Sequence, residues 1–207
     1  MLNNNRLRGL LIVLSSPSGG GKTSVYKELL RRYPKFKYSV SATTRPKRAN
    51  EIDGESYHFL DREEFVKKKD AGQFAEWAEV YGNYYGTYKD FIDRSLQQGE
   101  IILLDLDIQG AANLSRQYEE AVTVFILPPS LKVLEKRLIN RETDDPEVCK
   151  RRLQEAIKEI AEWPNYNYVV INDLLDDAVE DVATIIKAES LNSSRFPERY
   201  FENKFLK

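Results

Sequence analysis

The fold is decided by the stretch Leu10-Leu11-Ile12-Val13-Leu14-Ser15-Ser16-Pro17-Ser18-Gly19-Gly20-Gly21-Lys22-Thr23. Its first five residues are all apolar, without the alternation of a half-exposed strand. Such a run is typical of a strand that is buried on both faces of a parallel sheet. The glycines after it predict a tight bend, and a helix is expected to begin near Lys22.

The glycine-rich bend predicts a phosphate cradle. Consecutive glycines let backbone N–H groups converge on an anion, and the following helix presents its positive end. The segment matches G-x-x-x-x-G-K-[ST] except at the first position, where Ser16 replaces Gly. A turn that merely connects strand and helix is the alternative, disfavoured because every part of the motif occurs in order. The predicted nucleotide contacts are Ser18, Gly19, Gly20, Gly21, Lys22, Thr23 and Ser24, with Thr23 as a Mg²⁺ ligand and Ser24 as the less favoured alternative.

Further apolar runs and helical stretches alternate along the chain. This alternation predicts an α/β fold, a parallel sheet flanked by helices and joined by right-handed crossovers. The further strands are expected at 100–105, 121–127 and 168–171, and the helices at 22–33, 109–118, 131–141, 146–163 and 178–190.

Two segments depart from this texture. Residues 38–98 consist of short segments that are rich in aromatic residues and separated by turns. This pattern predicts an inserted subdomain with a small sheet of its own. The charge-rich segment 137–152 predicts a mobile flap, with Pro146 at the start of a helix. The expected boundaries are a core at 1–37, 99–130 and 156–190, the insertion at 38–98, a lid at 131–155 and an extension at 191–207.

Composition limits the class of protein. The 207 residues fit one globular domain, and a net charge of −2 disfavours a protein built to hold nucleic acid. Residues 6–48 nevertheless carry eleven Lys and Arg against the single acid Glu28, so this end is expected to face anions. The lone Cys149 cannot form an internal disulfide, which fits a reducing cytoplasm. No apolar run is long enough for a membrane span, so a soluble cytoplasmic protein without membrane partners is expected.

The inserted segment carries candidate groups for a second phosphate. Arg45 and Arg48 are three residues apart, a spacing that suits two guanidinium forks on one phosphate. Solvent-exposed arginines without a ligand are the alternative. Tyr57 and Tyr85 can each add a phenolic donor, although aromatic side chains in a small sheet more often serve packing.

Four segments together resemble the guanylate kinase family, in colinear order over about residues 9–190. They are Val40–Arg45, Phe74–Glu79 with Gly82–Thr87, Leu104–Gly110 and Phe125–Ser130. The resemblance implies a nucleoside monophosphate kinase with an inserted GMP-binding subdomain, a helical lid, and Mg²⁺ as the cofactor that accompanies ATP. It also implies that Arg45, Arg48, Glu51, Tyr57 and Tyr85 surround the GMP phosphate, that Ser41, Glu76 and Thr87 read guanine, and that Asp105 and Asp107 lie beside acceptor and metal.

The guanine assignment agrees with hydrogen-bond chemistry. Guanine presents two adjacent donors, N1–H and the exocyclic amine, which one carboxylate such as Glu76 can accept together. Hydroxyls of Ser41 and Thr87 can donate to the O6 acceptor. Taken alone, Glu76 would more often be an ordinary surface acid.

Acidic and basic groups elsewhere complete the expected catalytic site. Asp105 and Asp107 follow a buried strand, at the edge where ligands bind in open α/β sheets, although capping of the next helix is the alternative. The resemblance implies that Arg137, Arg141 and Arg152 are lid arginines that close over the transferred phosphoryl group. The alternative is that they lie on a solvent-exposed helix face. It places Asn172 near the adenine of ATP. The expected catalytic set is Lys22, Arg45, Asp105, Arg137, Arg141 and Arg152.

The expected activity is direct in-line transfer from ATP to GMP and to dGMP, by a monomer or homo-oligomer. Ser16, Ala49-Asn50 and Asn167 depart from the family pattern without removing a charged group assigned to chemistry. A non-catalytic guanylate-kinase-like binding module is one rival, opposed by the retained Lys22 and lid arginines. A related kinase with another acceptor is the second rival, opposed by Glu76.

Overall fold

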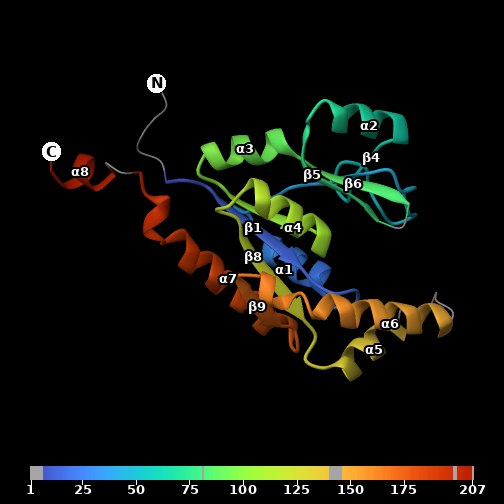
Figure 1. The fold of residues 1–207 in the computed structure, drawn as a ribbon. Coiled ribbons are helices and arrows are strands. Elements are labelled where there is room, and N and C mark those ends of the chain that lie inside the picture. The colour runs from blue at the N-terminus through green and yellow to red at the C-terminus, as the bar shows by residue number, and fades with distance from the viewer. Residues whose placement is uncertain (1–6, 81, 140–145, 198–199, 207) are drawn as a thin grey trace.

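The computed structural model describes residues 7–80, 82–139, 146–197 and 200–206. These residues form a central parallel sheet flanked by helices and a smaller mixed sheet beside it (Figure 1). The predicted α/β class, with a parallel core and a small inserted sheet, is confirmed. Within the described ranges, none of the helices combines the length and the apolar character needed to cross a membrane.

The central sheet has the strand order β2-β7-β1-β8-β9, and its neighbouring strands are parallel. The strand that precedes the glycines therefore lies in the middle, between β7 and β8, and all six of its residues are buried. The short edge strand β2 was not predicted. The strands are β1 (Leu10–Ser15), β2 (Lys37–Tyr38), β7 (Ile101–Asp105), β8 (Val122–Leu127) and β9 (Tyr168–Ile171).

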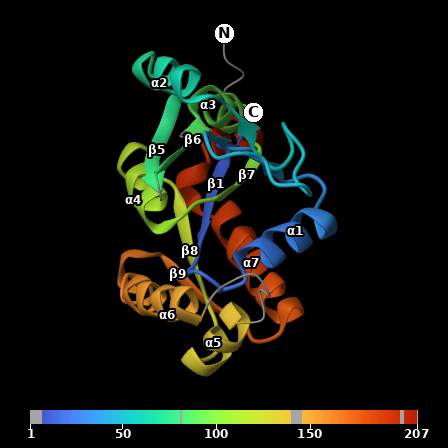
Figure 2. The same ribbon diagram turned by 90° about the vertical axis from the view of Figure 1, so that its right-hand side faces the viewer.

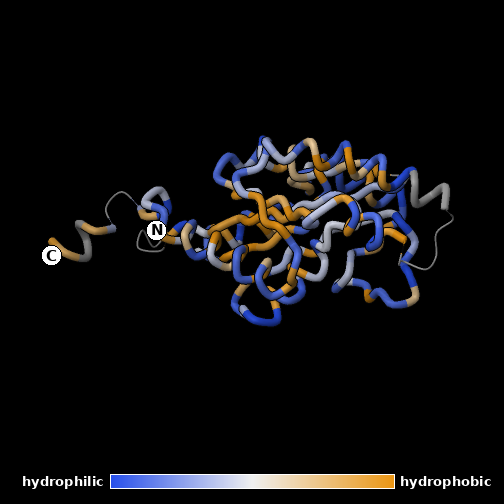
Figure 3. Tube along the Cα trace, turned by 90° about the horizontal axis from the view of Figure 1, so that it is seen from below, coloured by the Kyte–Doolittle hydropathy of each residue, from blue (hydrophilic) through white to orange (hydrophobic). Residues whose placement is uncertain are grey.

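Two layers of helices cover this sheet. Leu10, Ile12 and Leu14 pack with helices α1 (Lys22–Arg32) and α7 (Leu175–Ser190) in one apolar cluster. The intervening Leu11 and Val13 point the other way, toward α3 (Lys89–Gln97) and α4 (Ile108–Gln117). Figure 2 shows β1 between these layers, and Figure 3 shows the apolar residues concentrated along the sheet. Both faces of β1 are covered, which explains its unbroken apolar sequence.

The inserted unit is a mixed sheet of order β4-β3-β6-β5 with one helix. Its small core is formed by Ala42, Phe65 and Phe74. In Figure 1 it lies beside the central sheet, above α4. Its elements are β3 (Ala42–Thr43), β4 (His58–Phe59), α2 (Arg62–Asp70), β5 (Phe74–Val80) and β6 (Asn83–Tyr88).

Two helices pack together at the opposite end of the molecule, α5 (Leu131–Ile139) and α6 (Pro146–Ile160) (Figure 2). Leu134 and Leu138 of α5 meet Ala156 of α6 in a separate apolar cluster. Helix α6 continues across residue 155, where the sequence analysis ends the lid, and a short 3₁₀ turn, Trp163–Asn165, leads from it into β9.

The C-terminal extension is fastened to the core by Arg195. This side chain is 6% exposed and donates to the carbonyls of Gly9 (3.0 Å), Glu120 (3.3 Å) and Glu189 (3.2 Å). Its own carbonyl accepts the N–H of Arg8 at 2.9 Å. Arg195 is the last residue of the 3₁₀ turn Ser193–Arg195, and helix α8 (Tyr200–Phe205) lies near the end of the described chain. The extension therefore closes the edge of the core beside the start of β1.

Candidate functional site

The glycine-rich bend joins β1 to α1 and has the backbone that a phosphate cradle requires. Gly19 and Gly21 have φ values of 84° and 93°, a region that residues with a Cβ rarely adopt. A Cβ on Gly19 would also come within 2.9 Å of Leu134 on α5. Gly21 is the N-cap of α1 and provides no side-chain acceptor, and the first turn of the helix holds no acid. The positive end of α1 is thus presented to an anion without an internal carboxylate cap.

Lys22, the first residue of α1, is held by the end of β7. Its Nζ lies 2.5 Å from Asp105 Oδ1 and donates to the carbonyl of Leu106 at 2.5 Å. The parallel register pairs Leu14 with Asp105, so the carboxylate emerges beside the bend. Thr23 and Ser24 are exposed on the same turn. The predicted lysine, hydroxyls and strand-end acid therefore lie together.

A cavity of about 240 Å³ joins this bend to the inserted unit. The core contributes Lys22, Asp105 and Asp107 to its wall, and the inserted unit contributes Glu76. The structure thus brings together the two halves that the sequence analysis treats separately. The remaining lining residues are Ser41, Tyr57, Ala78, Val80, Tyr85, Leu106 and Gly110.

Glu76 is a buried carboxylate, 6% exposed, at the middle of β5. The fully buried Thr87, its partner across the strands, donates to Glu76 Oε1 at 2.6 Å. Burial raises the pKa of Glu76 to about 7, the Thr87 hydrogen bond works against this rise, and the charge of Asp107 adds to it. The Thr87 hydroxyl, expected to donate to a guanine oxygen, is here engaged by Glu76 and orients the carboxylate.

The predicted phosphate clamp is partly assembled around Arg45. Its guanidinium makes two bonds to Glu51, at 2.7 and 3.0 Å, and lowers the pKa of that carboxyl. It also lies 5.5 Å from the ring centre of Tyr57, which packs edge-on against Tyr85. Arg48 is exposed, and its contact with the group is a backbone N–H donated to Glu51 at 2.8 Å. Both tyrosines therefore line the cavity, and Arg45 contacts Tyr57 behind that lining, whereas neither Arg45 nor the exposed Arg48 lines it.

Asp107 combines the two roles that the sequence left open. Its side chain caps α4, because Oδ1 accepts the N–H of Gly110 at 2.6 Å, and the exposed residue also lines the cavity. Gly110 was not predicted as a site residue. A Cβ there would lie 3.1 Å from both Asp107 Oδ1 and Glu76 Oε2, so its absence leaves room for both carboxylates.

The two described lid arginines, Arg137 and Arg152, do not line the cavity. Arg137 of α5 donates to the carbonyl of Asn172 at 2.9 Å and lies 3.5 Å from that of Gly20. Arg152 is half-buried on α6, and Arg141 lies outside the described residues. Asn172, expected near adenine, is 5% exposed and donates to Gly20.

Residues that the sequence analysis missed fall into two groups. Ala78 and Val80 line the cavity with Glu76, and a search for the period of two along a strand would have found them. Glu159 of α6 accepts the N–H of Ser18 at 2.9 Å. The two residues are 141 positions apart in the sequence, and no sequence pattern predicts this contact.

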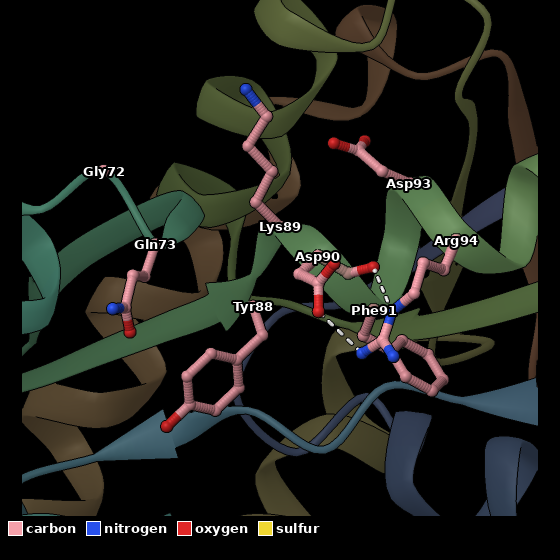
Figure 4. A pocket seen from close by; sticks show the side chains of 8 residues that line it. All are labelled: Gly72, Gln73, Tyr88, Lys89, Asp90, Phe91, Asp93 and Arg94. Atoms are coloured by element: carbon pink, nitrogen blue, oxygen red, sulfur yellow. Dashed lines mark hydrogen bonds and ion pairs between the residues drawn. The ribbon is translucent and has the colours of Figure 1, made fainter.

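A wider cavity, about 610 Å³, lies at the junction of the inserted unit and α3 (Figure 4). Three of its charged side chains already have partners within the protein: Arg94 reaches Asp90 at 2.6 Å, and Asp93 accepts the hydroxyl of Tyr118 at 2.7 Å. None of the predicted site residues lines it. The smaller cavity is therefore the candidate site.

The described residues include no cluster of three or more His, Cys, Asp or Glu side chains that could hold a metal ion alone. The oxygen groups present, the hydroxyl of Thr23 and the carboxylate of Asp105, are hard donors of the kind that Mg²⁺ prefers. They fit an ion that arrives with a nucleotide and takes most of its ligands from phosphate and water.

Comparisons with known proteins agree on one family. The family model described as guanylate kinase matches residues 8–189. A curated guanylate kinase of Carboxydothermus hydrogenoformans is 46% identical over 91% of this chain and 92% of its own length. One from Chelativorans sp. is 47% identical over 93% of this chain and 88% of its own. The crystal structure of guanylate kinase from Anaplasma phagocytophilum superposes with a TM-score of 0.82, at 32% identity and 98% coverage of both chains.

Proposed function

The chain belongs to the guanylate kinase family, and from this premise we propose that it transfers the terminal phosphoryl group of ATP to GMP. The observation that carries the proposal is the single cavity lined by both Lys22 and Glu76. A phosphate-binding lysine and a guanine-reading carboxylate on one wall are what direct transfer between two nucleotides requires. Phosphoryl transfer itself depends mainly on positioning and on neutralising charge.

On the donor side, we assign the triphosphate to residues 18–24. Backbone N–H groups around Gly19 and Gly21 contact phosphate oxygens, and Lys22 leaves Asp105 to reach the β- and γ-phosphates. The ion pair observed between Lys22 and Asp105 supports this, because it keeps the ammonium near the transfer point before ATP arrives. Mg²⁺ bound with ATP adds positive charge at the transferred group, with Thr23 and Asp105 as the residues that would hold it.

On the acceptor side, we assign GMP to the inserted unit, residues 38–98. Glu76 accepts the guanine N1–H and amine, and Ser41 lines the same cavity. Arg45, Tyr57 and Tyr85 hold the phosphate, for which Arg45 exchanges part of its Glu51 contact. Asp107 borders the cavity between guanine and core. Arg48 joins the phosphate by moving inward from its exposed position.

The lid proposal concerns residues 131–155. Closure of α5 and α6 over the cavity excludes water, so that ATP is not merely hydrolysed. Arg137, Arg141 and Arg152 are the proposed sources of positive charge. Transfer is direct and in-line, with no phosphorylated protein group. A cytoplasmic location fits, since the lone cysteine makes no internal disulfide and both substrates are cytoplasmic nucleotides.

The test is ADP formation from ATP over a panel of GMP, dGMP, AMP, UMP, TMP and a sugar phosphate, with and without Mg²⁺. Rapid turnover confined to guanine nucleotides and dependent on Mg²⁺ is expected. Preference for another acceptor would overturn the Glu76 assignment. A chain that binds little ATP in isothermal titration would instead be a non-catalytic member of the fold.

A further inference from the structure

Asn172 is a buried polar residue to which the proposed chemistry gives no clear task. It directly follows β9 and is 5% exposed. Its side-chain Nδ2 donates to the carbonyl of Gly20 at 3.0 Å. A side chain committed in this way to the protein is poorly placed to read a nucleotide base with the same group.

Asn172 also joins three elements through its other polar groups. Its backbone N–H donates to Leu127 at the end of β8, at 2.7 Å. Its carbonyl accepts the guanidinium of Arg137 from α5 at 2.9 Å. The glycine bend, the sheet and the lid helix therefore meet at this one residue.

The bend is packed directly on the Asn172 amide. A Cβ added to Gly21 would lie only 2.1 Å from Nδ2, so a side chain at this position would displace the Asn172 amide, in addition to the strain of its φ of 93°. Gly20 is buried, and its carbonyl therefore needs a donor, which Asn172 supplies and Arg137 approaches at 3.5 Å.

The planarity of the peptide bond gives this contact a consequence for the cradle. In a trans peptide the C=O of one residue and the N–H of the next point in opposite directions. Holding the Gly20 carbonyl toward Asn172 therefore turns the Gly21 N–H away from it. If this peptide rotated by half a turn, a carbonyl oxygen would face the anion and repel it.

We propose that Asn172 is a positioning residue that sets the Gly20–Gly21 peptide with its N–H toward the triphosphate. This inference rests on the proposed ATP-binding role of residues 18–24. It replaces the expected adenine contact of Asn172 with a contact to the cradle itself. Its effect is confined to the donor nucleotide, because the residue does not line the cavity that contains Glu76.

The test compares Asn172→Asp and Asn172→Ala with a matched control, Asn167→Ala. The aspartate keeps the shape of the side chain but, when ionised, offers no donor to Gly20. Asn167 lies at the other end of β9 and bridges to β8, where its Oδ1 accepts the N–H and hydroxyl of Thr123 at 2.8 and 2.9 Å. The control thus removes an asparagine that also bonds β8 but is exposed, at the end of β9 away from the bend.

The measurements are KM for ATP and for GMP, and calorimetric affinity for ATP and for inorganic tripolyphosphate. We expect Asn172→Ala to raise KM for ATP about ten-fold and Asn172→Asp to raise it further, because a buried carbonyl loses its donor. KM for GMP should stay within about two-fold of the wild-type value, since the cavity that contains Glu76 is untouched. Affinity for tripolyphosphate, which has no base, should fall as much as affinity for ATP.

Several results would overturn the proposal. One is an Asn172→Asp variant with unchanged KM for ATP, and another is a loss confined to ATP while tripolyphosphate binds normally, which would restore the adenine contact. A third is an equal rise of KM for ATP in Asn167→Ala, or an equal rise of KM for GMP in the Asn172 variants. Either result would mean general destabilisation. If wild-type protein binds ATP but phosphorylates an acceptor other than GMP, the proposed function is wrong. The role of Asn172 can still be tested in that case, because it concerns ATP binding alone.

Discussion

The donor and acceptor sides of the cavity are built in opposite ways. The cradle is one continuous bend whose binding groups are mostly backbone, fixed by two glycines with positive φ and by contacts to Asn172 and Leu134. The acceptor side is assembled from side chains on several short segments, tied by bonds such as those of Arg45 with Glu51 and Thr87 with Glu76. Under the proposed assignment, phosphate binding therefore depends on local main-chain geometry, whereas the choice of base depends on how separate segments are placed.

Of the variants that affect one side of the cavity only, Lys22→Ala is expected to have the largest effect. Loss of the ammonium should lower kcat by about 10³-fold, because a preorganised charge at the transferred group is removed. GMP affinity measured by calorimetry should stay close to that of the wild type. Near-normal turnover in this variant would mean that the bend does not serve as the cradle.

Glu76→Gln is expected to impair use of GMP and to leave use of ATP nearly unchanged, the reverse of Lys22→Ala. The amide presents N–H groups to the guanine donors, so kcat/KM for GMP should fall by about 100-fold or more while KM for ATP changes little. Glu79→Gln is the matched control, because Glu79 is exposed on the same strand. Equal losses in the two variants would show that a strand defect, and not guanine recognition, is being measured.

The acceptor side should also depend on pH through the carboxylate of Glu76. Glu76 has a pKa of about 7, raised by burial, and its protonated form cannot accept both guanine donors. Below pH 7, kcat/KM for GMP should therefore fall, approaching about ten-fold per pH unit. The GMP phosphate titrates near pH 6 in every variant, at about the value of other phosphate monoesters. In Glu76→Gln only that second decline should remain, and an unchanged profile would contradict the assignment.

The smallest effect is expected from Gly110→Ala, which shifts Glu76 without removing it. The added Cβ meets Glu76 Oε2 at 3.1 Å, a separation that moves the carboxylate by a few tenths of an ångström. KM for GMP should rise about three-fold, since larger misplacements cost far more. Thermal stability should rise or stay constant, because Ala favours a helix by about 1 kcal/mol over Gly. Gln109→Ala, exposed on the same turn, should leave KM unchanged.

The strand and helix on either side of the glycine bend were predicted well, because their sequence signal is contiguous. The run from Leu10 to Thr23 indicates strand, bend and helix within fourteen positions, and similar apolar runs indicated a parallel sheet without giving its strand order. The acceptor half carried a weaker signal. Helix α2 buries only Phe65 among its described residues, so hydrophobic periodicity did not reveal it, although Asp61 caps its start.

Contacts between distant residues explain the remaining differences. Thr87 was expected to face guanine, but the cross-strand register places its hydroxyl against Glu76. Arg137 and Asn172 were assigned from family position, and the packing of α5 on the bend was needed to find them at the Gly20 carbonyl. A motif states which residue types are present, whereas such bonds depend on how separate elements meet.

The strand order also has a consequence for biosynthesis. β1 emerges early from the ribosome, yet both of its neighbours are made much later, since β7 begins at Ile101 and β8 at Val122. Until they arrive, an apolar segment with unpaired backbone on both edges is exposed in the nascent chain, which is a hazard for aggregation. Its central position in the sheet therefore leaves β1 without its partner strands for much of translation.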